Sequence, residues 1–192
     1  MKNFQFVLMF FFMIPSVEAQ VSEKSGVFFA KEFSKEIALF NAKSFVMTQV
    51  LGESTGVTKF EIDPLAAASL GELTSLVYKC DEKNKAGLIL GFYGTRWNDA
   101  GVIFQQYSFL NLPEEKAKEM LNKIDAVIDE NYKYLTSDID NNNVYYRYGD
   151  MTFLICLRIT STRIRVFWNG FDSEWEFTAF KRTKKRLEKK LN

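Results

Sequence analysis

Histidine is absent from this chain of 192 residues, and its absence excludes several chemistries at once. Without an imidazole there is no Ser–His or Cys–His nucleophile pair, no histidine acid–base catalysis and none of the usual zinc sites. The sequence also lacks phosphate-binding glycine loops, dinucleotide-binding glycine motifs and N-glycosylation sequons. We therefore expect the protein to use no cofactor and no metal.

Long apolar runs are scarce, and the one that stands out lies near the N-terminus. Phe6–Ile14 is unbroken but only about half the ~20 residues that a membrane span needs. A lysine precedes it, and Val17-Glu18-Ala19 follows it with small residues at the two positions that a signal peptidase reads. We predict a secretory signal over residues 1–19, a mature protein that begins near Gln20, and a secreted or periplasmic location. The alternative is an uncleaved N-terminal anchor; no later segment is apolar enough to span a membrane.

Cysteine is also scarce, with Cys80 and Cys156 as the only two. An even number in an exported chain permits one disulfide, which the chain-entropy model values at roughly 4–5 kcal/mol because the closed loop is long. The alternative is two reduced cysteines that pack as small apolar side chains. The sequence leaves both states open.

Two segments match functional motifs only in part. Gly52-Glu53-Ser54-Thr55-Gly56 has the spacing of a serine-hydrolase nucleophile elbow, but strand-like residues follow it and no histidine is present, so we interpret it as a hairpin turn. Asp138-Ile139-Asp140-Asn141-Asn142 opens like a calcium loop, but it lacks the glycine at position six and the glutamate at position twelve. A solvated loop is the simpler interpretation, with an irregular calcium site as the alternative.

Composition predicts one folded α+β domain over residues 20–192. Apolar residues make up 47% of the chain and aromatic residues 16%, which is far from the composition of disordered proteins. Turn residues separate short strand-like runs, so we expect a mainly antiparallel sheet of about six to eight strands. The expected strands are 44–51, 57–62, 72–80, 87–94, 102–110, 144–148, 151–159 and 162–168, with a tight turn at Asn169-Gly170 and residues 27–42 unassigned.

Two helices are expected on this sheet. Residues 113–135 form the first, because proline and two glutamates stand at its start and apolar residues recur at steps of three and four. Its apolar stripe consists of Ala117, Met120, Leu121, Ile124, Val127, Ile128 and Tyr132. A basic helix from about Ala179 ends the chain. From residue 70 onward, the expected order is three strands, helix, three strands, helix.

Charge is unevenly distributed although the net charge is only +1. Residues 181–192 hold seven Lys or Arg and one Glu, so the rest of the mature chain is acidic. Such a basic segment attracts anionic lipid or another acidic polymer, and export makes nucleic acid an unsuitable partner. The candidate residues for contact with an anionic surface are Lys181, Arg182, Lys184, Lys185 and Arg186. The alternative is a solvated helix docked by Phe180 and Leu187.

A second candidate site consists of aromatic and polar residues in turns. Arg96, Trp97 and Asp99 lie in an expected seven-residue loop, and Trp168 precedes the Asn-Gly turn. Trp offers a stacking surface, Arg a fork of donors and Asp an acceptor, which suits a sugar or a peptide. The alternative is that each Trp ends a strand and covers the edge of the core.

By elimination, we predict an exported, non-enzymatic protein that binds a ligand, or a protein or glycan partner, in the cell envelope or outside the cell. Two alternatives stay open. One is a structural envelope component. The other is a histidine-free hydrolase that cleaves a glycan with paired carboxylates, for which the candidates are Asp99, Asp150, Asp172, Glu174 and Glu176.

Overall fold

The computed structural model describes residues 38–67, 72–97, 100–139, 141–158 and 161–191, without the side chains of residues 95–97, 103 and 104. The chain divides into two units, Met1–Glu36 and Ile37–Asn192, and all described residues belong to the second. The predicted signal over residues 1–19 and its cleavage point before Gln20 lie outside the described residues.

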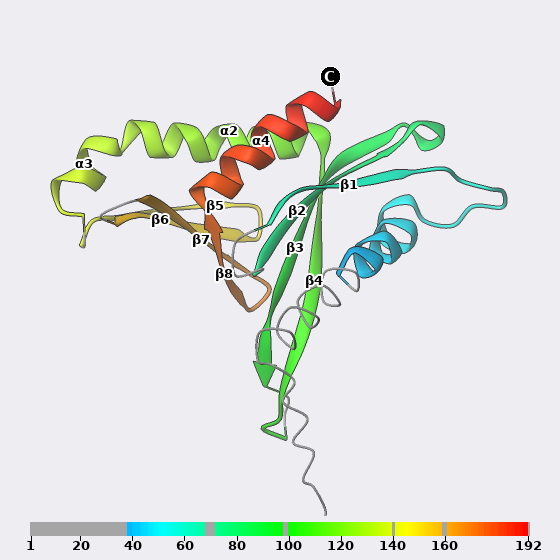
Figure 1. Cartoon of the computed structure of the whole chain (residues 1–192), viewed down its shortest axis with the longest axis horizontal. Helices are drawn as coiled ribbons and strands as arrows, with labels where there is room; N and C mark the ends of the chain where they lie inside the picture. Colours follow the sequence, from blue (N-terminus) through cyan, green and yellow to red (C-terminus); the bar gives the residue numbers. More distant parts are fainter. Residues whose placement is uncertain (1–37, 68–71, 98–99, 140, 159–160, 192) are drawn as a thin grey trace, which may run out of the picture. The chain divides into compact units, whose positions relative to one another are not determined.

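The first sheet is an antiparallel meander of four strands in chain order. Its strands are β1 (Glu61–Ala67), β2 (Leu73–Cys80), β3 (Lys85–Trp97) and β4 (Ile103–Pro113), and the short 3-10 turn η2 (Asp81–Lys83) joins β2 to β3 (Figure 1). The pairing of β2 with β3 ends at Leu73 and Phe92. Beyond Phe92, β4 is the strand with which β3 pairs in the described part of the chain, although the Tyr93 N–H still donates to the Glu72 oxygen; we call the ribbon of residues 93–97 and 103–107 the β3–β4 arm.

The second sheet repeats this arrangement with shorter strands. Its strands are β5 (Asn143–Tyr148), β6 (Met151–Arg158), β7 (Ser161–Trp168) and β8 (Phe171–Glu176), again antiparallel and in chain order. Asn169 and Gly170 have φ angles of 48° and 75° between the paired residues Trp168 and Phe171. Positive φ at both positions is what a two-residue hairpin turn requires, so the predicted turn is confirmed.

A helical segment follows each sheet, and another precedes the first. Residues 38–45 are α-helical and continue into the π-helical turn η1 (Val46–Leu51). The first sheet leads into α2 (Glu114–Glu130) and α3 (Tyr132–Ser137), and the second leads into α4 (Phe177–Leu191). The described part of the chain is therefore an α+β fold with eight antiparallel strands, a long amphipathic helix and a basic C-terminal helix, as predicted.

The long helix breaks once, at Asn131. The Asn131 side chain donates a hydrogen bond to the Val127 carbonyl oxygen at 2.8 Å, and its φ of −107° leaves the helical range. The predicted stripe from Ala117 to Ile128 is buried. Tyr132 lies beyond the break and is 58% exposed, so its assignment to the stripe was wrong.

Apolar residues form two clusters, one on each face of the first sheet. The larger lies among both sheets, α2 and α4, and its largest buried side chains include Phe92, Phe153, Trp175 and Phe180. The smaller lies under the N-terminal helical segment and joins Ala42, Val46, Val50, Leu51, Leu76, Tyr78, Cys80 and Ile89. The first sheet is therefore covered on both faces.

Residues 44–51 are helical, and the prediction of a strand there was wrong. Phe45, Val46, Thr48 and Val50 favour strands locally, but tertiary contacts decide their conformation. Two lysines, one in the turn η2 and one at the start of β3, satisfy carbonyl groups at the C-terminal end of the segment. Lys83 Nζ lies 2.8 Å from the Leu51 oxygen, and Lys85 Nζ lies 2.5 Å from the Val50 oxygen.

Three further boundaries differ from the predictions. The Gly52–Gly56 segment is not a hairpin turn, because it links a helical segment to β1. The strand expected at 57–62 begins instead at Glu61 and runs through Pro64, where the pairing with β2 shifts register. Residues 171–176 form a strand that was not predicted, so four strands rather than three lie between the helices α3 and α4, whereas the three strands expected between residue 70 and the first helix are present.

The two cysteines lie in different sheets, Cys80 at the end of β2 and Cys156 in β6. Cys80 is buried in the smaller cluster, and Cys156 is half-buried. Both are free thiols, so the disulfide that the sequence permits is not formed and the reduced alternative applies.

Candidate functional site

The underside of α4 is buried against both sheets. Its buried residues are Ala179, Phe180, Thr183 and Leu187. The Phe180 ring meets the Trp175 ring edge to face, with centroids 5.4 Å apart. Thr183 Oγ1 lies 2.6 Å from Ser75 Oγ of β2. These contacts determine which side of α4 faces away from the protein.

One flank of α4 is tied to α2 through a single carboxylate. Lys181 Nζ and Lys184 Nζ lie 2.6 and 2.5 Å from the two carboxylate oxygens of Asp125. Partial burial alone would raise the pKa of Asp125, but the two ammonium groups outweigh it and the pKa is lowered overall. Both lysines therefore hold the helix in place.

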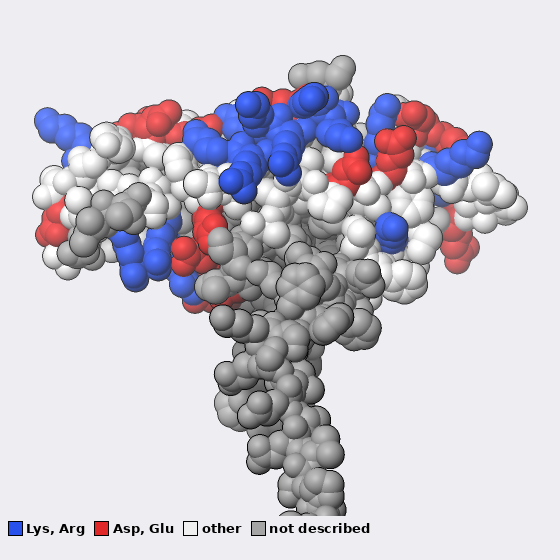
Figure 2. All heavy atoms as spheres, in the orientation of Figure 1, with Lys and Arg blue, Asp and Glu red and all other residues white. Residues whose placement is uncertain are grey.

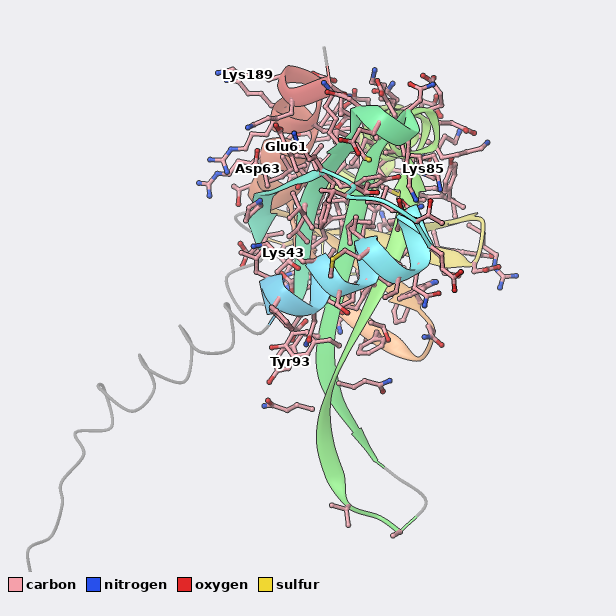
Figure 3. The ribbon with its side chains drawn as sticks, turned by 90° about the vertical axis from the view of Figure 1, so that its right-hand side faces the viewer. Lys43, Glu61, Asp63, Lys85, Tyr93 and Lys189 are labelled. Atoms are coloured by element: carbon pink, nitrogen blue, oxygen red, sulfur yellow. The ribbon has the colours of Figure 1, made fainter. Side chains whose placement is uncertain are left out.

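The other flank of α4 is tied to β1. Lys190 Nζ lies 2.6 Å from an oxygen of Asp63, and the Arg186 guanidinium donates to the Leu65 carbonyl oxygen. Figure 3 labels Asp63 on β1, together with its neighbour Glu61, beside α4. Four of the cations on α4 thus have partners in the fold.

The remaining cations of α4 are Arg182, Lys185 and Lys189, which we call the outer cationic face. They recur at steps of three and four residues, so they share one side of the helix, opposite the buried underside. All three are exposed, and within the described ranges no hydrogen bond or ion pair engages them. At 1.5 Å per residue, Arg182 and Lys189 lie about 10 Å apart along the axis. Lys and Arg side chains gather over α4 in Figure 2, and Lys189 extends away from the helix in Figure 3.

The five residues that the sequence predicted to contact an anionic surface fall into two groups in the structure. Arg182 and Lys185 point away from the protein, whereas Lys181, Lys184 and Arg186 have partners in the fold. The sequence interpretation omitted Lys189. Its helical spacing from Arg182 and Lys185 was the signal that could have identified it.

The second candidate site maps to the β3–β4 arm. Arg96 and Trp97 belong to β3, where they pair with Phe104 and Ile103, so the expected seven-residue loop is shorter than predicted. Asp99 and the side chains of Arg96 and Trp97 lie outside the described residues. Their role in ligand binding stays a prediction.

Trp168 packs near the base of this arm. Its ring lies 4.8 Å from the Phe92 ring, and it contacts the larger apolar cluster while remaining half-buried. Phe92 and Trp97 are five residues apart on one strand, or about 16 Å at 3.3 Å per residue. The backbone of Trp97 is therefore well separated along β3 from the residue that the Trp168 ring contacts.

Acidic residues on β8 are engaged by arginines of β7. Arg165 Nη2 lies 2.7 Å from Asp172 Oδ1, and Arg163 Nη1 lies 3.3 Å from Glu174 Oε2. These diagonal pairs link neighbouring strands. The carboxylates proposed for a hydrolase therefore occupy cross-strand ion pairs at these two positions.

A shallow hollow lies between the N-terminal helical segment and β1. Its volume is 440 Å³, and its lining residues are Lys43, Phe60, Glu61, Ile62 and Asp63. Figure 3 shows Lys43 on the helical segment and Glu61 and Asp63 on β1. Asp63 already pairs with Lys190. The hollow therefore presents fewer unpaired charged side chains than the outer cationic face of α4 does.

Neither metal ligands nor a membrane span can be assigned from the described residues. No three His, Cys, Asp or Glu side chains among them gather as metal ligands do. No helix in the same ranges combines the length and the apolar character that crossing a membrane requires. No protein-family model, curated protein or solved structure matches the chain.

Proposed function

We propose that this protein is exported and that it binds an anionic partner, in the cell envelope or outside the cell, through the outer cationic face of α4. It acts as a binding protein rather than as an enzyme. The observation that carries the proposal is the division among the cations of α4. Four of them have partners in the fold, whereas Arg182, Lys185 and Lys189 are exposed and unpaired among the described residues.

The spacing of these cations adds nothing to the stability of the helix. Lys185 and Lys189 stand four residues apart, and like charges at that spacing destabilise a helix by about 0.2–0.5 kcal/mol. An anionic partner removes this repulsion and converts the three charges into favourable contacts.

The surface suits a shallow electrostatic contact. The apolar residues of α4 lie on its underside, so its outer side has none to insert into a membrane. Each Lys or Arg near an anionic membrane contributes about 1 kcal/mol, and this contribution falls as salt screens the charges. The ligand chemistry is a closely spaced array of phosphate or carboxylate groups.

Binding of the protein beginning at Gln20 to defined surfaces tests this proposal. The probes are phosphatidylcholine vesicles with and without phosphatidylglycerol, and alginate as an acidic polysaccharide. We expect binding to at least one anionic probe, weakening as salt is raised, and none to neutral vesicles. The probe that binds identifies the source of the anionic groups. Absence of salt-sensitive binding to both anionic probes would refute the proposal.

Export is tested separately, by the intact mass of the protein recovered outside the cytoplasm. Removal of residues 1–19 is the expected result, because Val17 and Ala19 meet the small-residue requirement of a signal peptidase. A full-length chain retained in the cytoplasm would contradict this part of the proposal.

A further inference from the structure

An open hollow lies between helix α2 and the edge strand β5, remote in sequence from the outer cationic face. Its volume is 550 Å³. Helix α2 contributes Glu119, Asn122, Lys123 and Ala126 to its lining, and β5 contributes Tyr146, Arg147 and Tyr148. A groove between a helix and an edge strand can accept an extended peptide as an additional strand.

The outer edge of β5 is open for such pairing. Among the described strands β5 is the first of its sheet, so one row of its backbone N–H and C=O groups has no neighbouring strand there. Two of the other edge strands carry features that hinder pairing: β1 contains Pro64 and a register shift, and on β8 the Glu174 N–H donates to Glu72 Oε2 at 3.1 Å. β5 has neither device within its six residues.

The carboxylate at the hollow, Glu119, already has two partners within the protein. Glu119 Oε2 lies 2.9 Å from Lys116 Nζ and accepts a hydrogen bond from the Tyr148 hydroxyl at 3.0 Å. These two hydrogen bonds lower the pKa of Glu119, which stays ionised and engaged. It therefore offers little repulsion to an incoming anion.

Two cations among the residues that line the hollow are unengaged in the described part of the chain. Lys123 and Arg147 are both exposed, and no hydrogen bond or ion pair links either of them to the described part of the chain. Exposure alternates along β5, so Arg147 and Tyr145 belong to the open face of the sheet, whereas Tyr146 and Tyr148 face α2. Lys123 is on α2. An added strand would therefore meet one free cation on each of its two faces.

We propose that β5 and α2 bind an extended acidic peptide, which adds a strand to the β5 edge. Backbone hydrogen bonds to β5 supply the common part of the affinity, and side chains on alternate sides of the peptide supply specificity. An acidic side chain over the hollow meets Lys123, and its neighbour in sequence meets Arg147. Tyr145, which is 72% exposed, covers the peptide on the open face.

Selection from a random octapeptide display library tests this proposal on the protein beginning at Gln20. We expect enriched peptides with adjacent acidic residues among β-branched or aromatic ones. Their synthetic forms should bind roughly tenfold more weakly to the Lys123→Gln/Arg147→Gln variant than to the wild type, since two exposed ion pairs are lost. N-methylation of alternate peptide nitrogens on the pairing side should abolish binding, because it removes the backbone donors.

Two further variants of the protein serve as controls. Lys133→Gln/Arg158→Gln removes the same charge from exposed residues outside the lining of the hollow and should bind the peptides as the wild type does. Arg182→Gln/Lys185→Gln/Lys189→Gln should also retain peptide binding, which separates this site from the proposed function of α4. The proposal fails if no peptide is enriched, if the enriched peptides lack acidic residues, or if the Lys123/Arg147 variant binds as tightly as the wild type.

Discussion

Ser75 of β2 and Thr183 of α4 share a hydrogen bond of 2.6 Å although both residues are fully buried. Ser75 Oγ also accepts a hydrogen bond from the Ala66 N–H at 3.2 Å, and Thr183 Oγ1 donates to the Ala179 oxygen at 2.9 Å. The contact therefore joins β1, β2 and α4. It sets the rotation of α4 about its axis, and with it the direction of the outer cationic face.

A double-mutant cycle at this pair should show coupling. Thr183→Val keeps the shape of the side chain but removes the hydroxyl, and we expect a loss of about 1 kcal/mol in the free energy of unfolding. Ser75→Ala should cost a similar amount, and the double variant less than the sum, because the hydrogen bond between the two hydroxyls can be lost only once. Urea unfolding gives the free energy of unfolding of the wild type, the two single variants and the double variant. Losses in the double variant that equal the sum of the two single losses would contradict the coupling.

The Asp125 carboxylate should make stability depend on pH. Its pKa in the folded protein is lowered, so its contribution is present above its ordinary pKa and is lost as the pH falls through the lowered value. We expect Asp125→Asn to cost about 1 kcal/mol at pH 7, with the difference from wild type shrinking as the pH falls below about 4 and vanishing only below the lowered pKa of the folded protein. The control is Asp129→Asn, an exposed residue on the same helix. A difference that persists unchanged at acidic pH would contradict the ion-pair interpretation.

Tyr146 carries a hydroxyl that stabilises nothing in the described structure. The oxygen is buried without a hydrogen-bond partner among the described residues, and burial raises the pKa of the phenol. Its ring stacks on the Phe153 ring with centroids 5.1 Å apart. Tyr146→Phe keeps the stacking and removes the unsatisfied group, so we expect a gain of about 1 kcal/mol in unfolding free energy. Tyr148→Phe, which loses the bond to Glu119, should show no such gain, and a destabilised Tyr146→Phe protein would refute the assignment.

Ile124 tests the packing of α2. Its side chain is fully buried in the larger apolar cluster. Ile124→Ala should lower the unfolding free energy by about 2–4 kcal/mol, since it removes apolar contacts and leaves a cavity. Asn122→Ala, at an exposed position on the same helix, provides the control. An unchanged unfolding midpoint for Ile124→Ala would show that the stripe is not part of the core.

The helix α2 could be predicted from the sequence because its signal is local. Ala117 to Ile128 repeat with helical period, and the acids and proline at the start agree with that pattern. Residues 44–51, by contrast, have a local sequence that favours a strand although they are helical in the structure. Phe45, Val46 and Val50 suit a strand, and their helical state depends on Lys83, Lys85 and the second face of a sheet that lies later in the chain. Such distant contacts leave no local periodicity.

The candidate site shows the same limit. Charge along residues 181–192 was visible, but the sequence does not tell which lysines are engaged. Asp125 and Asp63 engage Lys181, Lys184 and Lys190 across long stretches of chain, and only the folded arrangement reveals these pairs. Helical spacing alone could have grouped Lys189 with Arg182 and Lys185.

We propose that Arg182, Lys185 and Lys189, which have no partner among the described residues, bind an anionic partner. The most direct measurement compares the dissociation constant of Arg182→Gln/Lys185→Gln/Lys189→Gln with that of Lys59→Gln/Lys133→Gln/Arg158→Gln on the anionic probe that the wild type binds. Both variants lose the same charge, but the second set is dispersed over a loop, α3 and β6. At about 1 kcal/mol per cation, the α4 variant should bind on the order of 100-fold more weakly than the wild type, and the dispersed variant should change only a few-fold. Equal losses for the two variants, or wild-type affinity in the α4 variant, would contradict the account.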